Sequence, residues 1–244
     1  MRLMKRILSA AAVLALSASL LVGCSSGTAS SVPVSASSAA ESTVSSVEET
    51  ASSAVDENEA AAAQLLNDLT GSYQELWPVI LADEYKQTWL DDCTALVGED
   101  NAEAAFEKLS SMVTGDVYGE DAVKAYANGG GAYFCGFTNS LAILTFDGET
   151  STISGTDKDG NVLFSHTYHY IGMEPVRGLY EFQSDDADSG EFTYFFLAPD
   201  TSAETYHIEF RYGSDAEALS QYDAGEYAYW LASGISTDCD QTMI

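Results

Sequence analysis

The sequence predicts a mainly β protein, in which a closed antiparallel β-barrel follows a helical N-terminal half. Before Ala132 the chain contains helix-forming segments interrupted by glycine and proline, whereas after it short β-branched and aromatic runs alternate with Asp-, Gly- and Ser-rich turns. The short connections favour hairpins. A sheet of six or more such strands, aromatic on both faces, is expected to close into a barrel, because closure leaves no unpaired edge.

Residues 1–24 have the pattern of a secretory signal. Basic residues within the first six positions precede an apolar run that ends at Val22 and is too short and too rich in Ser and Ala for a comfortable membrane span. The run continues into Leu-Val-Gly-Cys, which resembles the bacterial lipobox. We therefore expect a lipoprotein signal peptide, with Cys24 lipidated and the protein anchored to the outside of the bacterial cell membrane. An ordinary secretory signal that ends near a cysteine is the alternative.

Residues 25–55 are predicted to be a disordered tether. Twelve of these residues are serine, none is aromatic, and the apolar content is limited to Val, Ala and one Pro. Such a segment cannot bury enough apolar surface to offset its chain entropy. We expect it to hold a single folded domain, residues 56–244, away from the membrane.

The charge of the chain excludes one class of partner. Once the basic residues of positions 1–24 are set aside, six Lys and Arg remain against 38 Asp and Glu. A surface this acidic repels nucleic acid. Besides Cys24 the cysteines are Cys93, Cys135 and Cys239, without a CxxC motif, so a zinc–thiolate site has no support. One disulfide is possible outside the cell, and the sequence leaves its pairing open.

The segments expected to be helical have acidic starts, good helix formers and a glycine at or beyond their ends. They are residues 56–71, 77–97, 101–113 and 119–131, followed by one short helix late in the chain at 214–222. The segments expected to be strands are 140–146, 150–156, 161–172, 178–184, 192–198 and 206–213.

The last of these strands contains His207 and Glu209, which are two residues apart. Side chains at positions i and i+2 of a strand project from the same face, so an imidazole and a carboxylate should lie side by side. Both groups are ligands for zinc, although zinc sites normally use three or four protein ligands. The pair alone is therefore an incomplete metal site.

Five stretches together resemble the ZinT/YodA family of bacterial extracytoplasmic zinc-binding proteins. They occur in the family's order and at nearly its spacing: LTGSYQELWPVI (69–80), TYHYIG (167–172), PVRGLYEFQSDDADSGEFTYF (175–195), YHIEFRYG (206–213) and YAYWL (227–231). The resemblance implies a lipocalin-like barrel with attached helices, and a protein that binds zinc. Between the second and third stretches this chain is shorter than the family by most of a hairpin.

The resemblance also implies which positions face the metal. The family's three histidine ligands fall on Ala198, His207 and Glu209, so one ligand is lost, one is kept and one is replaced by a carboxylate. The family's His-rich acidic loop is absent, and a Ser-rich tether stands in its place. This chain therefore departs from the family at the metal site itself.

A third ligand could come from elsewhere in the chain. His169 is the preferred candidate, because Tyr168 and Tyr170 would more naturally fill the packed face of their strand and leave His169 on the other. Asp200, in the loop after Ala198, is a further candidate. His166 shares the face of the tyrosines and is expected to be a structural residue.

These observations favour a membrane-anchored lipoprotein that captures zinc or a similar divalent ion and delivers it, with a metal transporter component as a possible partner. The alternative is a metal-free barrel that binds a small organic ligand or a protein partner. An enzyme is not expected, because the sequence offers no nucleophile–base arrangement, nucleotide-binding loop or pair of embedded carboxylates. A metal titration separates the first two.

Overall fold

In the computed structural model of this chain, residues 57–199 and 206–239 are described. The chain divides into two units, Met1–Asn58 and Glu59–Ile244. Only two helical residues of the first unit are described, so the fold below is that of the second. None of the helices in the described part is long and apolar enough to cross a membrane.

Several predictions concern residues outside the described ranges. They are the signal peptide 1–24 with Cys24, the tether 25–55, and Asp200 as a metal ligand. All of these remain predictions.

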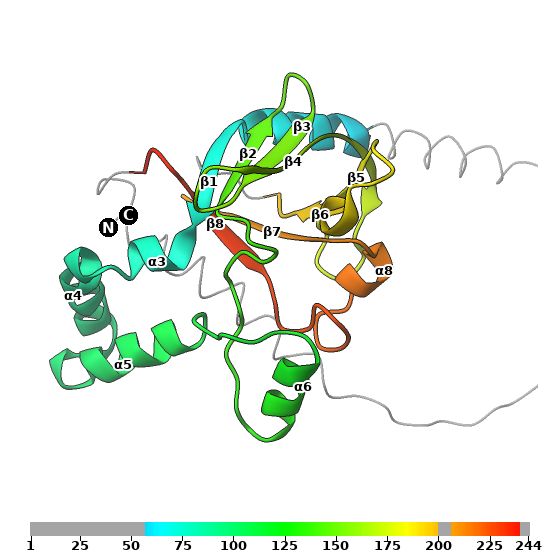
Figure 1. The fold of residues 1–244 in the computed structure, drawn as a ribbon. Coiled ribbons are helices and arrows are strands. Elements are labelled where there is room, and N and C mark those ends of the chain that lie inside the picture. Colours follow the sequence, from blue (N-terminus) through cyan, green and yellow to red (C-terminus); the bar gives the residue numbers. More distant parts are fainter. Residues whose placement is uncertain (1–56, 200–205, 240–244) are drawn as a thin grey trace, which may run out of the picture. The chain divides into compact units, whose positions relative to one another are not determined.

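Eight antiparallel strands form one closed barrel, and each strand pairs with its neighbours in the sequence (Figure 1). This is the up-and-down arrangement of lipocalins, and it confirms the predicted fold class. The strands are β1 (Gly71–Glu75), β2 (Ile143–Asp147), β3 (Thr152–Thr156), β4 (Val162–Met173), β5 (Tyr180–Ser184), β6 (Tyr194–Leu197), β7 (Ile208–Gly213) and β8 (Ala232–Ser236).

The barrel closes between its first and last strands. Tyr73 of β1 pairs with Ser236 of β8, and Glu75 pairs with Gly234. Neither strand was anticipated, because β1 lies in the half expected to be helical and β8 reads Ala-Ser-Gly-Ile-Ser, which lacks a β signal. Small residues are required here, since a Cβ on Gly234 would lie 3.1 Å from Ile208 and 3.3 Å from Tyr73.

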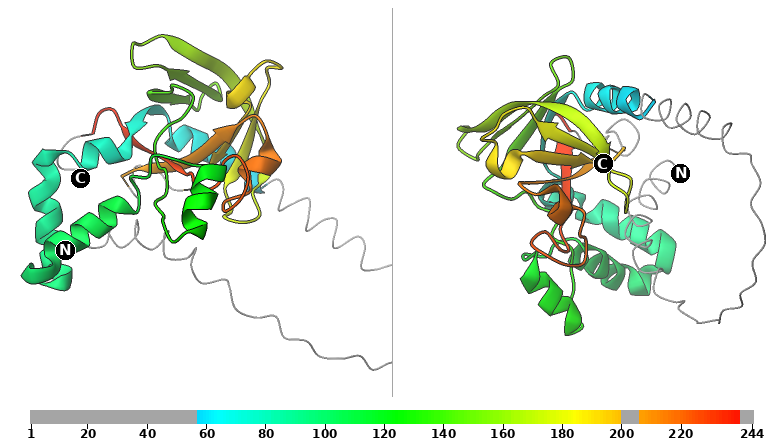
Figure 2. Two further views of the ribbon diagram at one scale, coloured as in Figure 1. Left: turned by 60° about the horizontal axis from the view of Figure 1, so that its bottom comes forward. Right: turned by 90° about the vertical axis from the view of Figure 1, so that its right-hand side faces the viewer.

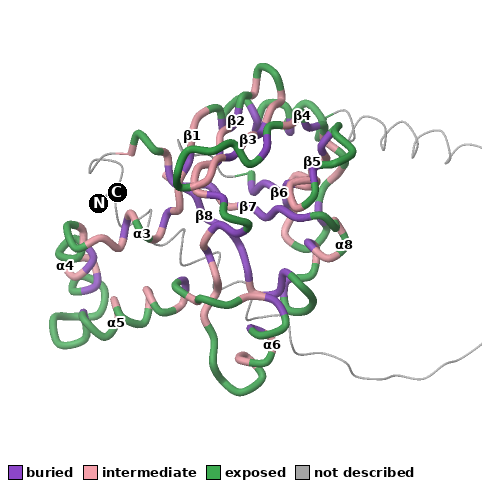
Figure 3. The backbone as a smooth tube through the Cα atoms, viewed as in Figure 1, coloured by how far each residue is buried: buried purple, intermediate pink, exposed green. Residues whose placement is uncertain are grey.

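Aromatic side chains fill the barrel. Alternation along each strand directs them inward. The strands β6, β7 and β8 are mostly buried in Figure 3, whereas β4 is largely exposed. Phe195 is fully buried and its ring lies 5.4 Å from Tyr168 and 5.3 Å from Tyr212. One end of this core is extended by the helical residues 57–68, whose apolar stripe belongs to the same hydrophobic cluster: Ala62, Leu65 and Leu66, with Leu69 just beyond.

Apart from the short turn η3, the remaining helices lie where the sequence predicted helical segments. They are α3 (Leu76–Ile80), η2 (Asp83–Tyr85), α4 (Lys86–Val97), α5 (Glu99–Ser111), α6 (Glu120–Ala127) and α8 (Ala216–Leu219), with a short turn η3 (Gly190–Phe192). The helices α4 and α5 pack against each other as a hairpin (Figure 2). The Trp89 ring of α4 contacts the Phe106 ring of α5, and the Trp89 indole donates a hydrogen bond of 2.8 Å to the Ile80 carbonyl of α3.

Candidate metal-binding site

Strand β7 separates two chemical environments. Phe210 and Tyr212 point into the barrel, where Phe210 packs 5.3 Å from Phe137 and Tyr212 packs 5.0 Å from Trp230. Alternation places Glu209 and Arg211 on the opposite face, which we call the β7 wall. His207 directly precedes the strand and its side chain turns to the same wall.

The structure brings His207 and Glu209 together, as their spacing predicted. His207 Nε2 lies 3.8 Å from Glu209 Oε1, and the two side chains are 7% and 17% exposed. The separation is too long for a hydrogen bond between these atoms. Two ligands of one tetrahedral zinc ion lie about 3.4 Å apart, given zinc–ligand bonds of about 2.0–2.1 Å. The two atoms therefore need to move only slightly to share an ion.

The surroundings of this pair are also largely buried. Ala198, where the resemblance places the missing histidine, is 6% exposed, and its amide donates a hydrogen bond to the Glu209 carbonyl. On the other side Glu209 is paired in register with Ser233 of β8. The Ser233 amide in turn donates to the carbonyl of Cys135, a residue whose position here no sequence pattern predicted.

Cys135 carries a buried thiol. Burial, followed by the negative charge of Glu209, raises the pKa of this thiol to about 12. The thiol is therefore protonated at neutral pH when no cation is bound. No local sequence signal marks Cys135, because it approaches Glu209 only through the pairing of its segment with β8.

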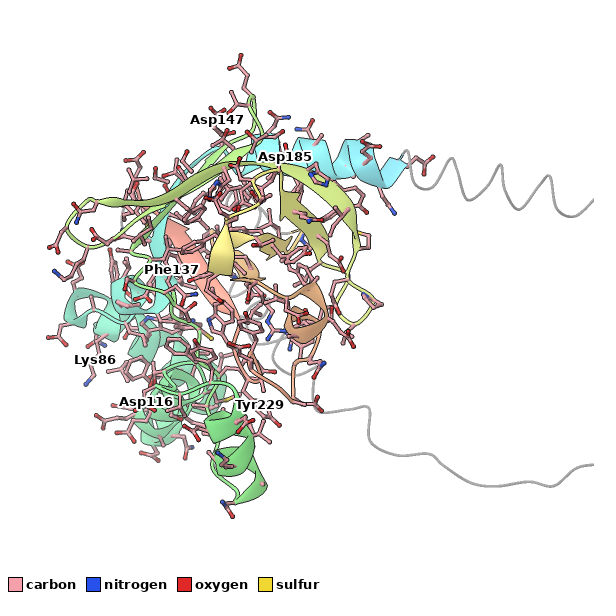
Figure 4. All side chains as sticks on the ribbon, turned by 45° about the vertical axis from the view of Figure 1, so that its right-hand side comes forward. Lys86, Asp116, Phe137, Asp147, Asp185 and Tyr229 are labelled. Carbon is pink, nitrogen blue, oxygen red and sulfur yellow. The ribbon has the colours of Figure 1, made fainter. Side chains whose placement is uncertain are left out.

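His169 lies elsewhere. On β4 it belongs to the exposed face, and its Nδ1 donates a hydrogen bond of 2.6 Å to Asp185. Its register position, traced across β5 and β6, corresponds to Gly213 rather than to Glu209. In Figure 4, Asp185 lies at the end of the barrel away from Tyr229. The structure thus does not bring His169 to the pair on the β7 wall.

The packed face of β4 carries both Tyr168 and His166. Tyr168 does fill the packed face and is 2% exposed. His166 lies on that same face, stacks 5.9 Å from Phe164, and is hydrogen-bonded to Asp186 through a contact of 2.6 Å. Both β4 histidines are therefore engaged with aspartates. Within the described ranges, no group of three or more His, Cys, Asp or Glu side chains is arranged to hold a metal ion.

The far end of the β7 wall contains a buried arginine. Arg211 is fully buried and donates hydrogen bonds to the carbonyls of Leu219, Gln221 and Tyr227. Its guanidinium also lies 4.4 Å from the centre of the Tyr222 ring. Burial lowers the pKa of Arg211 to about 10, which leaves it charged at neutral pH. Arg211 thus fastens the segment from α8 to β8 onto the barrel.

A second arginine completes this cluster. Arg177 stacks 4.3 Å from the Tyr222 ring on the same tyrosine that Arg211 contacts. Glu174, only 1% exposed, accepts hydrogen bonds from the Val176 and Arg177 amides at 2.8 and 2.6 Å. Glu174 thus has a structural role at the turn before β5, which spacing along the chain could not have indicated.

Comparison with known proteins adds little to this description. No protein-family model matches the chain, and no curated protein is similar to it in sequence. Among solved structures, the Zn(II)-bound ZinT-like domain of Streptococcus pneumoniae AdcA is similar at 16% identity and a TM-score of 0.45, over 73% of this chain and 88% of that domain. Zn(II)-bound AdcA from Streptococcus pneumoniae is similar at 15% identity and a TM-score of 0.40, over 72% of this chain and 33% of its own. Similarity this slight does not establish a family or a function.

Proposed function

We propose that this protein binds a divalent metal ion, zinc in the first instance, through His207 and Glu209 on the β7 wall. The observation that carries the proposal is the position of the two side chains, with Nε2 and Oε1 3.8 Å apart in a largely buried place. The Glu209 carboxylate is partly buried, at 17% exposure, so its charge is less well screened by water than that of a surface carboxylate. A divalent cation held by both groups compensates that charge.

The donor set determines the kind of binding. Imidazole and carboxylate suit zinc, whereas magnesium and calcium prefer sites built from oxygen alone. Two ligands hold an ion less firmly than the three or four of a typical zinc site, so we expect micromolar or weaker affinity. The strongly acidic composition of the chain raises the local concentration of cations around it. Weak, exchangeable binding suits capture and delivery of the ion better than permanent storage.

The proposal places this activity outside the cell. Lipidation at Cys24 and the tether 25–55 would keep the barrel near the membrane, where a metal transporter component could receive the ion. Replacement of Cys24 by alanine should then release the protein from the membrane fraction into the medium. Retention of the Cys24→Ala variant in the membrane fraction would show that the anchor lies elsewhere, without affecting the metal site.

An organic ligand inside the barrel is a weaker alternative. The inward-facing rings of Phe146, Phe182, Phe195 and Phe210 are each at most 1% exposed. Rings that contact one another across the barrel, such as Phe195 and Tyr212, occupy the space that such a ligand would need. The interior is thus favoured as a packed core.

The proposal is tested by calorimetric titration of the chain without residues 1–24 with zinc chloride, using wild type and two single variants. We expect His207→Ala and Glu209→Gln each to weaken zinc binding about tenfold or more, since each removes one of two ligands. Glu209→Gln keeps the size of the side chain and removes its charge. Magnesium should bind weakly to wild type: its affinity should not exceed the affinity of either variant for zinc.

His169→Ala is the matched control, because it removes a histidine that also stands beside a carboxylate but at an exposed place. Its zinc affinity should equal that of wild type. The proposal fails if wild type binds no zinc at millimolar concentration, or if His207→Ala binds zinc as well as wild type does.

A further inference from the structure

Tyr206, which directly precedes the candidate ligand His207, has an unusual backbone conformation. Its φ is 62°, in the left-handed region that glycine adopts readily and that is unfavourable for a residue with a bulky side chain. Among the described residues, the other non-glycine residues with a positive φ are Asn139, Ser140, Ser151 and Tyr229. Unfavourable conformations of this kind often occur at binding sites, where the surrounding structure holds them in place.

The ring of Tyr206 lies against the imidazole of His207. The two ring centroids are 4.9 Å apart and the planes meet at 61°, an edge-to-face contact of the kind that aromatic rings prefer. Consecutive residues of an extended strand project from opposite faces, so an extended residue at this position would direct its ring away from His207. The left-handed conformation removes this alternation just before β7 begins, and the two neighbouring rings meet.

The contact restricts how the imidazole can turn. His207 is 6% exposed, and its Nε2 lies 3.8 Å from Oε1 of Glu209. A ring packed against the imidazole disfavours rotamers that would carry Nε2 away from the carboxylate. A side chain that is ordered before the ion arrives loses less conformational entropy on binding. Glycine would adopt the same φ without strain, so we attribute the tyrosine to its ring and not to its backbone.

We propose that Tyr206 is a positioning residue of the metal site, whose ring holds the His207 imidazole in the orientation that binds an ion together with Glu209. This inference rests on the proposed function, because an aromatic contact alone is not a metal site. Tyr206 is not itself a ligand, and its hydroxyl takes no part in binding the ion. Groups that orient a ligand without touching the metal contribute to the affinity of metal sites.

Calorimetric titration with zinc chloride tests this role in the chain without residues 1–24. Tyr206→Phe keeps the ring and should bind zinc as wild type does. Tyr206→Gly keeps the backbone conformation but removes the ring, and should bind zinc about three- to tenfold more weakly, the effect of one side chain that must be ordered on binding. The urea midpoint of zinc-free Tyr206→Gly should stay close to that of wild type, because relief of the unfavourable φ offsets the lost contact.

Tyr229→Gly is the matched control. Tyr229 also has a positive φ, of 57°, but its ring stacks 3.8 Å from that of Tyr126 and not on a histidine. Its replacement should leave zinc affinity unchanged. A second measurement uses wild type alone: nuclear Overhauser cross-peaks between the rings of Tyr206 and His207 should persist when zinc is added.

The outcomes separate this inference from the function on which it rests. If wild type binds zinc and Tyr206→Gly binds it equally well, the positioning role is wrong although the metal site stands. The same conclusion follows if Tyr206→Phe loses as much affinity as Tyr206→Gly, or if the cross-peaks disappear when zinc is added. If wild type binds no zinc, the proposed function fails and the inference fails with it. The cross-peaks require no substitution, so the test remains decisive even if Tyr206→Gly folds poorly.

Discussion

All three histidines of the chain stand beside a carboxylate, but in two different settings. At the β4–β5 hairpin, His166 and His169 form contacts of 2.6 Å with Asp186 and Asp185, whose side chains are each 53% exposed. On the β7 wall, His207 and Glu209 are 3.8 Å apart and nearly buried. The hairpin pairs are hydrogen-bonded, whereas Nε2 of His207 and Oε1 of Glu209 are too far apart for a hydrogen bond with each other.

The difference shows how burial changes what the same two groups can do. In water, an imidazole and a carboxylate satisfy each other or the solvent, and their contact adds little free energy. Away from water an ionised carboxylate must be compensated by hydrogen bonds or by another charge. Of the two arrangements, the pair on the wall has the less exposed carboxylate, and a cation bound there would compensate its charge. The comparison therefore favours the β7 wall, and not the hairpin, as the functional region.

The largest expected effect concerns Arg211, the other charged residue of the β7 wall. We expect Arg211→Met to lower the free energy of unfolding by about 3 kcal/mol, because it leaves buried carbonyls of the segment after α8 without donors. Urea denaturation followed by circular dichroism measures this change. Lys86→Met is the control, since Lys86 is exposed, and its effect should stay within about 0.5 kcal/mol.

If Arg211→Met lowers the free energy of unfolding by less than about 1 kcal/mol, a buried charge on the β7 wall can be replaced by an apolar side chain with little loss of stability. Buried charges on the β7 wall would then need no more compensation than the exposed charges at the hairpin, and the two regions would not differ in this respect.

A smaller effect should appear at alkaline pH. Burial, then Glu209, raises the pKa of the Cys135 thiol to about 12, above its ordinary value of 9.0. A group whose pKa is raised by folding stabilises the native state fully below its unfolded pKa, and this contribution is lost as the pH rises toward the folded pKa. We expect wild type in the presence of EDTA to lose about 1–2 kcal/mol more stability than Cys135→Ser between pH 8 and about 10.5.

Thermal unfolding of both proteins across this pH range measures the difference. Cys93→Ser should behave as wild type does, apart from its own smaller upward shift. If stability changes with pH in the same way for wild type and Cys135→Ser, the thiol ionises in the folded protein as readily as in the unfolded chain. Water would then reach this part of the wall more easily than its burial indicates.

The sequence predicted those features that depend on local periodicity. The alternation in residues 206–213 placed His207 beside Glu209, and the change of pattern at Ala132 placed the barrel. The strands that close the barrel were missed, because the sequence of β8 depends on how closely Gly234 approaches Ile208 of β7 on one side and Tyr73 of β1 on the other. These close contacts form only in the tertiary structure. In the sequence they are visible only as small residues.

The places of His169 and Cys135 in the fold illustrate the same limit. His169 was chosen by the face of its own strand, but the barrel turns that face to the outside and gives the histidine Asp185 as a partner. Cys135 and Glu209 are far apart in the sequence, and the Cys135 segment lies near the wall only because it pairs with β8. Neither fact follows from spacing along the chain.

The smallest expected effect concerns the exposed pair at the β4–β5 hairpin, with which the pair on the β7 wall is compared. His169 and Asp185 are each 53% exposed, so their contact competes with hydrogen bonds to water and is screened by salt. We expect the coupling free energy between them, measured by a double-mutant cycle of His169→Ala and Asp185→Asn, to be about 0.5 kcal/mol and smaller still in 1 M salt. Added zinc should raise the unfolding temperature of all four proteins of the cycle equally, because the ion binds elsewhere. A coupling above about 1.5 kcal/mol, or a zinc effect that depends on His169, would place a functional histidine at the hairpin and remove the reason to prefer the buried wall.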